Sequence, residues 1–255
     1  MEELFISGVH NYCDRWCERC PFTARCRVYA DEQELSEEAK DPQDPAFWQN
    51  IKKSFEGVLE MLHKMMEEMG IDPAEVEKMP NPEPDPDIKA LEKMTREKTM
   101  QYADSVDQFF KHDSAFFEQK SDELAEQIEA GKPVDLESWQ FFQDAVEVIR
   151  WYQYFISAKI HRAVTGLEDE EEDRIQNDSN GSAKIAMIAV ERSLGAWEVL
   201  RRQLPEKGDE ILELQRRLQH LRAEINRLFP HWAQFHRPGF DDEPGSTVRL
   251  DFNPN

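Results

Sequence analysis

The stretch that decides the fold reads WQFFQDAVEVIRWYQYFISAKIHRAV at residues 139–164. At 100° per residue, one face of a helix collects most of its apolar side chains. That face consists of Trp139, Phe142, Val146, Ile149, Tyr152, Ile156, Ile160 and Ala163. The rest of the surface is largely covered by Phe141, Val148, Trp151, Phe155 and Ala158. A helix that is apolar nearly all round is packed by neighbours on several sides, so this segment is predicted to lie at the centre of a helical bundle.

A second buried helix is predicted further along the chain. Residues 183–197 read AKIAMIAVERSLGAW, and their small side chains allow a neighbouring helix to approach closely. We therefore expect helices at about 135–164 and 182–203 to pack against each other and form the core. The side chains expected to be mostly buried there are Trp151, Tyr152, Ile156, Ile160, Ile188 and Trp197.

The composition favours an all-α fold. The chain has 255 residues with only 10 glycines, and Glu, Leu, Ala, Lys, Gln and Met are plentiful, which is a set of strong helix formers. A strand-like alternation occurs only at residues 246–252. The pattern predicts a five- to six-helix bundle with a short N-terminal four-cysteine metal module and an irregular C-terminal tail.

The boundaries between these parts follow from prolines, glycines and charge runs. The expected segments are a four-cysteine metal-binding module at 1–30, an acidic linker at 31–45, the helical bundle at 46–230 and the irregular tail at 231–255. Within the bundle, four alternating prolines predict an extended spacer at 79–86, and an acidic loop is expected at 167–181. Helical periodicity begins near Pro45, and Gly70 is the expected stop.

The net charge restricts the classes of partner. Fifty-three acidic and 31 basic residues give a formal charge of −22. Bare nucleic acid is not expected as a partner, and neither is an anionic membrane surface, because both require basic protein surface. No run of 18 apolar residues predicts a transmembrane helix, and residues 1–5 do not resemble a signal peptide. A cytoplasmic location is expected.

The strongest chemical signal is the pattern Cys13-x3-Cys17-x2-Cys20-x5-Cys26. On a helix, the first three cysteines would fall within about 60° of one another. Pro21 would end that helix, and Cys26 would fold back as a fourth ligand. Four thiolates that converge in this way suit either Zn²⁺ or an iron–sulfur cluster.

The run CERCPFTARC at residues 17–26 resembles the C-x2-C-P-[FY]-x3-C part of the iron–sulfur staple in RecB-type helicase–nucleases. The resemblance implies a [4Fe–4S] cluster with Cys17, Cys20 and Cys26 as ligands, and Cys13 would take the remaining ligand role. In that family the first cysteine lies far upstream, whereas here it is four residues away. The resemblance covers about ten residues and implies the cofactor, not the nuclease activity, because a nuclease core needs strands.

Three other states of the cysteines stay open. A structural zinc site is the main alternative, although zinc knuckles usually have two well-separated C-x2-C pairs. Two disulfide bonds are disfavoured by the expected reducing compartment. The thiols could also be free or otherwise engaged.

A carboxylate–histidine site is the second candidate. Its members would be Glu147, Tyr154 and His161 along the central helix and Glu191 in the apolar run of the next buried helix. A ferritin-like di-iron site needs two Glu-x-x-His pairs, and the chain has only Glu60 with His63. The favoured interpretation is therefore structural: Glu147 and Glu191 form ion pairs with Arg150, Arg162 or Arg192.

Two functions follow from these features. The first is a metal-binding helical protein whose centre staples the N-terminus to the bundle, with a scaffold or partner-binding role. A partner protein could use the charged helix at 207–228, and a homo-oligomer stays open. The alternative is a redox enzyme or electron carrier with a pocket built from Glu147, Tyr154, His161 and Glu191, so enzymatic activity is left undecided.

Four tail residues that could bind a metal are expected to be solvated: His231, His236, Asp241 and Asp242.

The apolar residues that flank the cysteines are too many for a 30-residue segment to cover. They are Phe5, Ile6, Val9, Tyr12, Trp16, Phe22, Val28 and Tyr29. We therefore expect the segment to pack against the bundle rather than to move freely on the acidic linker.

Overall fold

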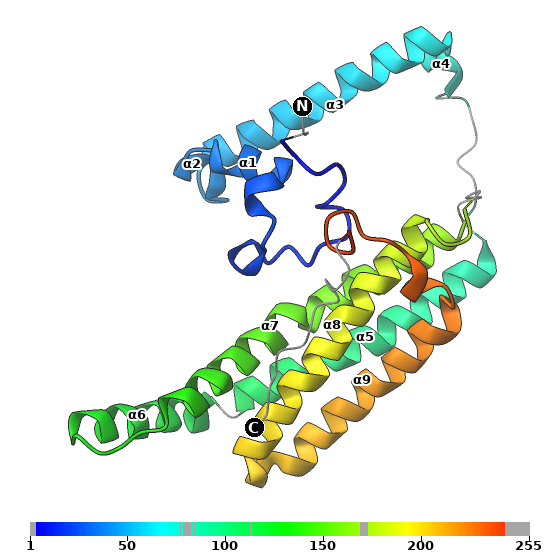
Figure 1. Cartoon of the computed structure of the whole chain (residues 1–255). Coiled ribbons are helices and arrows are strands. Elements are labelled where there is room, and N and C mark those ends of the chain that lie inside the picture. The colour runs from blue at the N-terminus through cyan, green and yellow to red at the C-terminus, as the bar shows by residue number, and fades with distance from the viewer. Residues whose placement is uncertain are drawn as a thin grey trace. The chain divides into compact units, whose positions relative to one another are not determined.

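The computed structural model describes residues 4–76, 78, 83, 85–112, 114–168 and 173–242. Within these ranges all regular secondary structure is helical, which confirms the all-α class (Figure 1). The strand-like segment at 246–252 lies outside the described residues, as do most of the proline-rich spacer and the middle of the acidic loop. Across the described ranges, no helix combines the length and the apolar character that a membrane span requires.

The chain divides into two compact units. The first contains the residues up to His10 and those from Arg15 to the proline-rich spacer, and the second contains Asn11–Asp14 and the chain from Asp85 onward. This division differs from the predicted bundle at 46–230, because helix α3 (Pro45–Met69) belongs to the first unit. Periodicity shows that α3 is amphipathic, but it does not show which unit the helix joins.

Four long helices form the second unit. They are α5 (Pro86–His112), α7 (Leu136–Thr165), α8 (Asp178–Gln203) and α9 (Gly208–Leu228). Helices α7 and α8 pack against each other as predicted, α5 lies against α7, and α9 lies against both α8 and α5 (Figure 1). Helix α6 (Ser114–Glu129) precedes α7, and the short turns η3 (Gly166–Glu168) and η4 (Pro205–Lys207) follow α7 and α8.

Local capping explains where the two central helices begin. The Asp135 carboxylate accepts a hydrogen bond from the Ser138 backbone N–H at 3.0 Å and caps α7. The Asn177 side chain accepts from the Asn180 N–H at 2.8 Å and caps α8. Helix α8 therefore starts four residues before the predicted position 182, inside the segment expected to be a loop.

The core of the bundle is centred on Trp197 of α8, which is fully buried. Its indole N–H donates to the Tyr102 hydroxyl at 3.0 Å, and its ring lies against Phe109 and Phe110, with centroids 5.1 and 6.0 Å away. Four of the six predicted core residues are buried: Tyr152, Ile156, Ile160 and Trp197. Ile188 is partly buried, and the expectation fails at Trp151, which is 37% exposed.

The first unit contains several short helices and one long helix. Its turns η1 (Cys17–Arg19) and η2 (Thr23–Arg25) are followed by α1 (Arg27–Gln33), α2 (Glu37–Lys40), α3 and α4 (Pro73–Val76). The predicted linker at 31–45 is thus partly helical, because the Ser36 hydroxyl caps α2 by accepting from the Ala39 N–H. Helix α3 begins at Pro45 and ends at Gly70, whose φ of 67° provides the left-handed stop that the sequence predicted.

Residues 231–242, the described part of the predicted tail, contain only the short turn η5 (Trp232–Gln234) and are not a solvated segment. Phe235 and Arg237 are buried, and η5 contacts α8. The Lys184 ammonium of α8 donates to Asp241 at 2.7 Å and also to the Phe235 carbonyl. Arg237 pairs with the same carboxylate at 3.0 Å. The tail was expected to be solvated because its composition is polar, and the sequence does not reveal that Lys184 can neutralise Asp241.

Acid is expected to release this tail from α8. Burial raises the pKa of Asp241, but hydrogen bonds from Arg237 and Lys184 outweigh it and lower the pKa from 3.8 to about 2. Because the folded-state pKa is depressed, the stabilisation is complete above about pH 4 and is lost as the pH falls towards 2. The depressed pKa of Asp241 contributes ~2 kcal/mol to the free energy of unfolding. Acid unfolding followed by circular dichroism measures the loss of folding stability between about pH 4 and pH 2. This loss should be smaller in Asp241→Asn than in Glu206→Gln, a charge-matched change at an exposed site.

Candidate functional site

Three of the four cysteines lie on tight turns of the first unit. Cys17 begins η1, Cys20 follows it, and Cys26 lies between η2 and α1. The Cys20 N–H donates to the Cys17 carbonyl at 3.1 Å, and the Phe22 N–H donates to Cys20 Sγ at 3.4 Å. A backbone donor directed at sulfur stabilises a thiolate, so the turn at residues 17–22 suits a cysteine that acts as a metal ligand.

The helix predicted to carry Cys13, Cys17 and Cys20 on one face does not form. Arg15 has a φ of +60°, which no α-helix allows, and it interrupts the backbone between Cys13 and Cys17. Cys13 consequently belongs to the second unit and the other three cysteines to the first. The spacing of i, i+4 and i+7 indicated a helix, but the spacing alone does not reveal a left-handed residue between the cysteines.

All four cysteines are half-buried, and they are not joined in disulfide bonds. Throughout the part of the chain that the structure describes, no three or more His, Cys, Asp and Glu side chains form a group that could hold a metal ion.

The residues next to Cys13 are held on the bundle by a buried polar network. The Tyr152 hydroxyl of α7 donates to Asp14 Oδ2 at 2.7 Å, and the Arg192 guanidinium of α8 donates to the same oxygen at 2.5 Å. The Trp151 indole N–H donates to the Asp14 backbone carbonyl at 3.1 Å. This contact explains why Trp151 lies at the surface of α7 rather than in the core.

The electrostatics of this network keep Tyr152 a hydrogen-bond donor. Burial raises the pKa of the Tyr152 hydroxyl, and the neighbouring Asp14 charge raises it further. Burial lowers the pKa of Arg192, but its interactions with Tyr152 and Asp14 outweigh burial and raise the pKa overall. A neutral phenol, a carboxylate and a guanidinium form a charge-balanced cluster, so the arrangement is a structural anchor rather than an acid–base pair poised near neutral pH.

Tyr12, on the other side of Cys13, is anchored separately. Its hydroxyl donates to Asp178 Oδ1 at 3.1 Å, and Arg162 makes two hydrogen bonds to the same carboxylate. The Tyr12 ring lies edge-on to Phe235, with centroids 4.6 Å apart. Gly181 leaves room for this ring, because a Cβ there would lie 2.3 Å from Tyr12 Cε1. Both neighbours of Cys13 are therefore fixed to the second unit.

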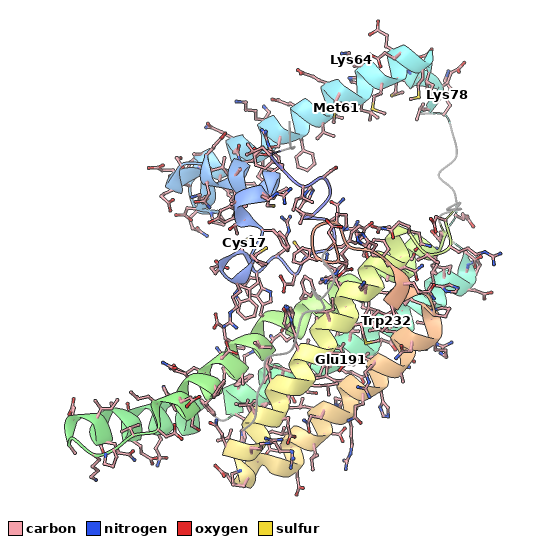
Figure 2. All side chains as sticks on the ribbon, in the orientation of Figure 1. Cys17, Met61, Lys64, Lys78, Glu191 and Trp232 are labelled. Atoms are coloured by element: carbon pink, nitrogen blue, oxygen red, sulfur yellow. The ribbon has the colours of Figure 1, made fainter. Side chains whose placement is uncertain are left out.

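The carboxylate–histidine pocket predicted on the bundle is not assembled. Glu147, Tyr154 and His161 are spaced by seven residues, and all three lie exposed along α7. His161 Nδ1 is 3.1 Å from Glu92 of α5. Glu191 lies on α8 and pairs with Arg222 of α9 at 3.3 Å (Figure 2). Residues spaced by seven share one face of a helix, and that face can point to solvent or to a core. On α7 the face with Glu147, Tyr154 and His161 points to solvent.

The arginines expected to neutralise Glu147 and Glu191 have other contacts. Arg150 lies over the Phe110 ring at 4.7 Å, Arg162 binds Asp178, and Arg192 binds Asp14. Glu191 is ion-paired, as the structural interpretation required, but with Arg222, which was not among the expected partners. Glu60 and His63 of the single Glu-x-x-His pair are exposed on α3.

Sequence reasoning missed Asp14, Arg192 and Gly181 as a set. Each residue looks ordinary by itself: an acid beside a cysteine, an arginine in an apolar helix and a glycine near an acidic loop. The one available signal was Arg192, since a charged residue inside the apolar run at 183–197 requires a buried partner. Its partner lies 178 residues away in sequence, so local patterns could not identify it.

Comparison with known proteins finds no relative that would name this site. No family model, no curated protein and no solved structure matches the chain.

Proposed function

We propose that Cys13, Cys17, Cys20 and Cys26 bind one metal centre, a [4Fe–4S] cluster or alternatively Zn²⁺, in a short N-terminal module. The centre is structural: it staples the N-terminal segment to the helical bundle in a protein with a scaffold or partner-binding role. The observation that carries the proposal is the anchoring of Cys13. Its neighbours Tyr12 and Asp14 both form hydrogen bonds to bundle residues, so a metal ligand at Cys13 would be tied to the bundle.

Two further features support a metal. All the cysteines of the chain lie within residues 13–26, and Cys20 Sγ already accepts a backbone hydrogen bond. All four are half-buried, so thiolates there remain reachable by a metal while being partly shielded from water. Small metal sites are seldom formed before the metal arrives, and the binding free energy can pay for closing the loop around it.

A structural role is favoured over a redox enzyme. The enzyme hypothesis needs a substrate or second-metal pocket, and the residues expected to form it lie apart on α7 and α8. The polar network next to Cys13 is charge-balanced and mostly buried, which suits an anchor. The role in partner binding rests on the charged surface of α9, where Glu213 forms ion pairs with Arg216 and Arg217.

Anaerobic purification with metal analysis tests the proposal. The wild-type chain is expected to carry either one iron–sulfur cluster, with a brown colour that bleaches with dithionite, or one zinc per chain without colour. Cys17→Ser should lose most of the metal, whereas Glu18→Gln, a change at the adjacent exposed residue, should retain it. A wild-type chain with neither iron nor zinc after reconstitution would contradict the proposal.

Thermal unfolding tests the staple itself. Cys17→Ser and a deletion of residues 1–30 are each expected to lower the melting temperature of the bundle by several degrees, the shift that accompanies a loss of ~1–2 kcal/mol. Glu18→Gln should melt like the wild type. If both altered chains kept the wild-type melting curve, the bundle would be autonomous and the cysteine segment would be a mobile interaction module.

A further inference from the structure

Helix α3 carries a continuous apolar seam that is exposed to solvent. The seam residues follow one another at intervals of three and four, which is a heptad repeat sustained over the whole helix. They are Trp48, Ile51, Phe55, Val58, Leu62, Met65 and Met69. Each of these side chains is between 36% and 67% exposed. Leu59 and Met61, which flank the seam, are 52% and 60% exposed and widen the apolar face.

The size of this face is what a stable interface requires. A large aromatic side chain buries about 150–250 Å². The seam has two aromatic and five smaller aliphatic side chains, each about half-exposed, so it leaves on the order of 600 Å² of apolar surface in water. The flanking Leu59 and Met61 bring the face near the ~800 Å² that each partner buries in a standard interface. Single apolar residues on a surface need no explanation, but a continuous patch of this size marks an interaction site.

The repeat also specifies the shape of the partner. A seam with a period of 3.5 residues is matched by another helix with the same period, whose side chains fit between those of α3. The opposite side of α3 is polar and carries Lys53, Glu60, Lys64 and Glu67, all exposed (Figure 2 labels Lys64 and Met61). Helix α9 has a similar 3–4 seam from Ile211 to Ile225, but it is buried in the bundle. Within the first unit, the seam of α3 is left largely exposed.

We propose that the partner is α3 of a second copy of this chain, packed antiparallel. Charge supports this occupant, since three lysines and four glutamates give α3 a net charge of −1 in a chain of −22. Its small net charge lets this helix approach its own copy with little repulsion. Lys52 flanks the seam near the start of the helix, and Glu68 flanks it near the end. An antiparallel pair sets each lysine end beside a glutamate end, whereas a parallel pair sets like charges together.

In that arrangement the seam residues pair in layers around the middle of the helix. Phe55 of one copy faces Met65 of the other, and Val58 faces Leu62. Each layer occurs twice because the pair is symmetric about a two-fold axis. The proposal is independent of the proposed metal centre, whose four cysteines lie within residues 13–26, outside α3.

The test is the mass of the full-length chain by analytical ultracentrifugation over a range of concentrations. The wild type is expected to be a dimer, and Leu62→Glu should weaken dimerisation at least about tenfold because it buries a charge in a central layer. Gln49→Glu adds the same charge on the polar side of α3 and should leave the dimer unchanged. Circular dichroism of each variant verifies that the helices remain folded.

A wild-type chain that stays monomeric would overturn the proposal, whether its seam is covered by its own bundle or by another protein. A dimer that survives Leu62→Glu would overturn it as well. Metal content is measured on the same samples. A chain that dimerises without bound metal would support this proposal even if the proposed metal centre were wrong.

Orientation is tested by mixing wild type with a chain in which both flanking end charges are reversed, K52E/E68K. An antiparallel pair keeps complementary ends within each chain type but places like charges together in the mixed dimer. Wild-type and reversed chains should therefore sort into separate homodimers at low salt, as read by energy transfer between labelled copies. Preferential mixing would show a parallel pair and overturn the antiparallel assignment.

Discussion

Trp197→Ala is expected to destabilise the chain by ~3–5 kcal/mol, the usual cost of removing a buried tryptophan. Trp197 is fully buried, its ring contacts Phe109 and Phe110, and its N–H donates to Tyr102. The variant loses these contacts and leaves a cavity between α5 and α8. At ~2–4 °C per kcal/mol for a protein of this size, the melting temperature should fall by ~10 °C or more.

Two further variants sharpen this prediction. Leu212→Ala removes a side chain that is 37% exposed on α9, and it should cost well under the loss at Trp197. Trp197→Phe keeps an aromatic ring but deprives the buried Tyr102 hydroxyl of its indole donor, and combining it with Tyr102→Phe gives a double-mutant cycle for that hydrogen bond. A Trp197→Ala chain as stable as Leu212→Ala would show that the core is not centred on this residue.

Arg192→Ala is expected to release the anchor of the cysteine segment and to cost ~2–4 kcal/mol. The side chains of Arg192 and Asp14 are only 25% and 18% exposed, so the variant leaves a mostly buried carboxylate without its cation. Calorimetry should show a melting temperature lower by ~5–10 °C. Arg216→Ala breaks an ion pair whose side chains are 66% and 53% exposed, and it should cost less than ~0.5 kcal/mol.

Gly181→Ala tests the same anchor without changing a charge. The added methyl group would clash with the Tyr12 ring, so Tyr12 should leave its place between α8 and Phe235. In both variants the Cys13 thiol should react faster with a thiol reagent than in wild type, because its two neighbours no longer hold it. If Arg192→Ala were no more harmful than Arg216→Ala, the network around Asp14 would contribute nothing to holding residues 11–14.

The outcome at α7 and α8 shows how far local patterns reach. The apolar stripe from Trp139 to Ala163 predicted a central helix, and α7 packs against α8 as expected. The same periodicity misjudged Trp151 and the stripe of Glu147, Tyr154 and His161. The hydrophobic period predicts that the segment is helical. When a helix is apolar on two sides, the period does not predict which side neighbouring helices will cover.

The cysteines show the limit for a candidate site. Their spacing predicted four thiolates that converge, and that prediction remains a proposal. It also predicted a helix through Cys13, Cys17 and Cys20, which the positive φ of Arg15 rules out. A single residue with positive φ changes the direction of the chain. Glycine, as at position 70, favours such a conformation and can be predicted to adopt it, whereas an arginine gives no such indication.

The helical class, the extents of α3 and α7 and the stop at Gly70 could be predicted from the amino-acid sequence alone. These features depend on propensity, capping and periodicity, which act over a few residues and can be read along the chain. The contacts of Asp14 with Tyr152 and Arg192, and of Lys184 with Asp241, are visible only in the folded structure. The same holds for the exposure of the α3 seam within the first unit. Such pairings join residues far apart in sequence. They are set by how whole helices pack, because the free energy of burying a charge or an apolar face depends on what covers it.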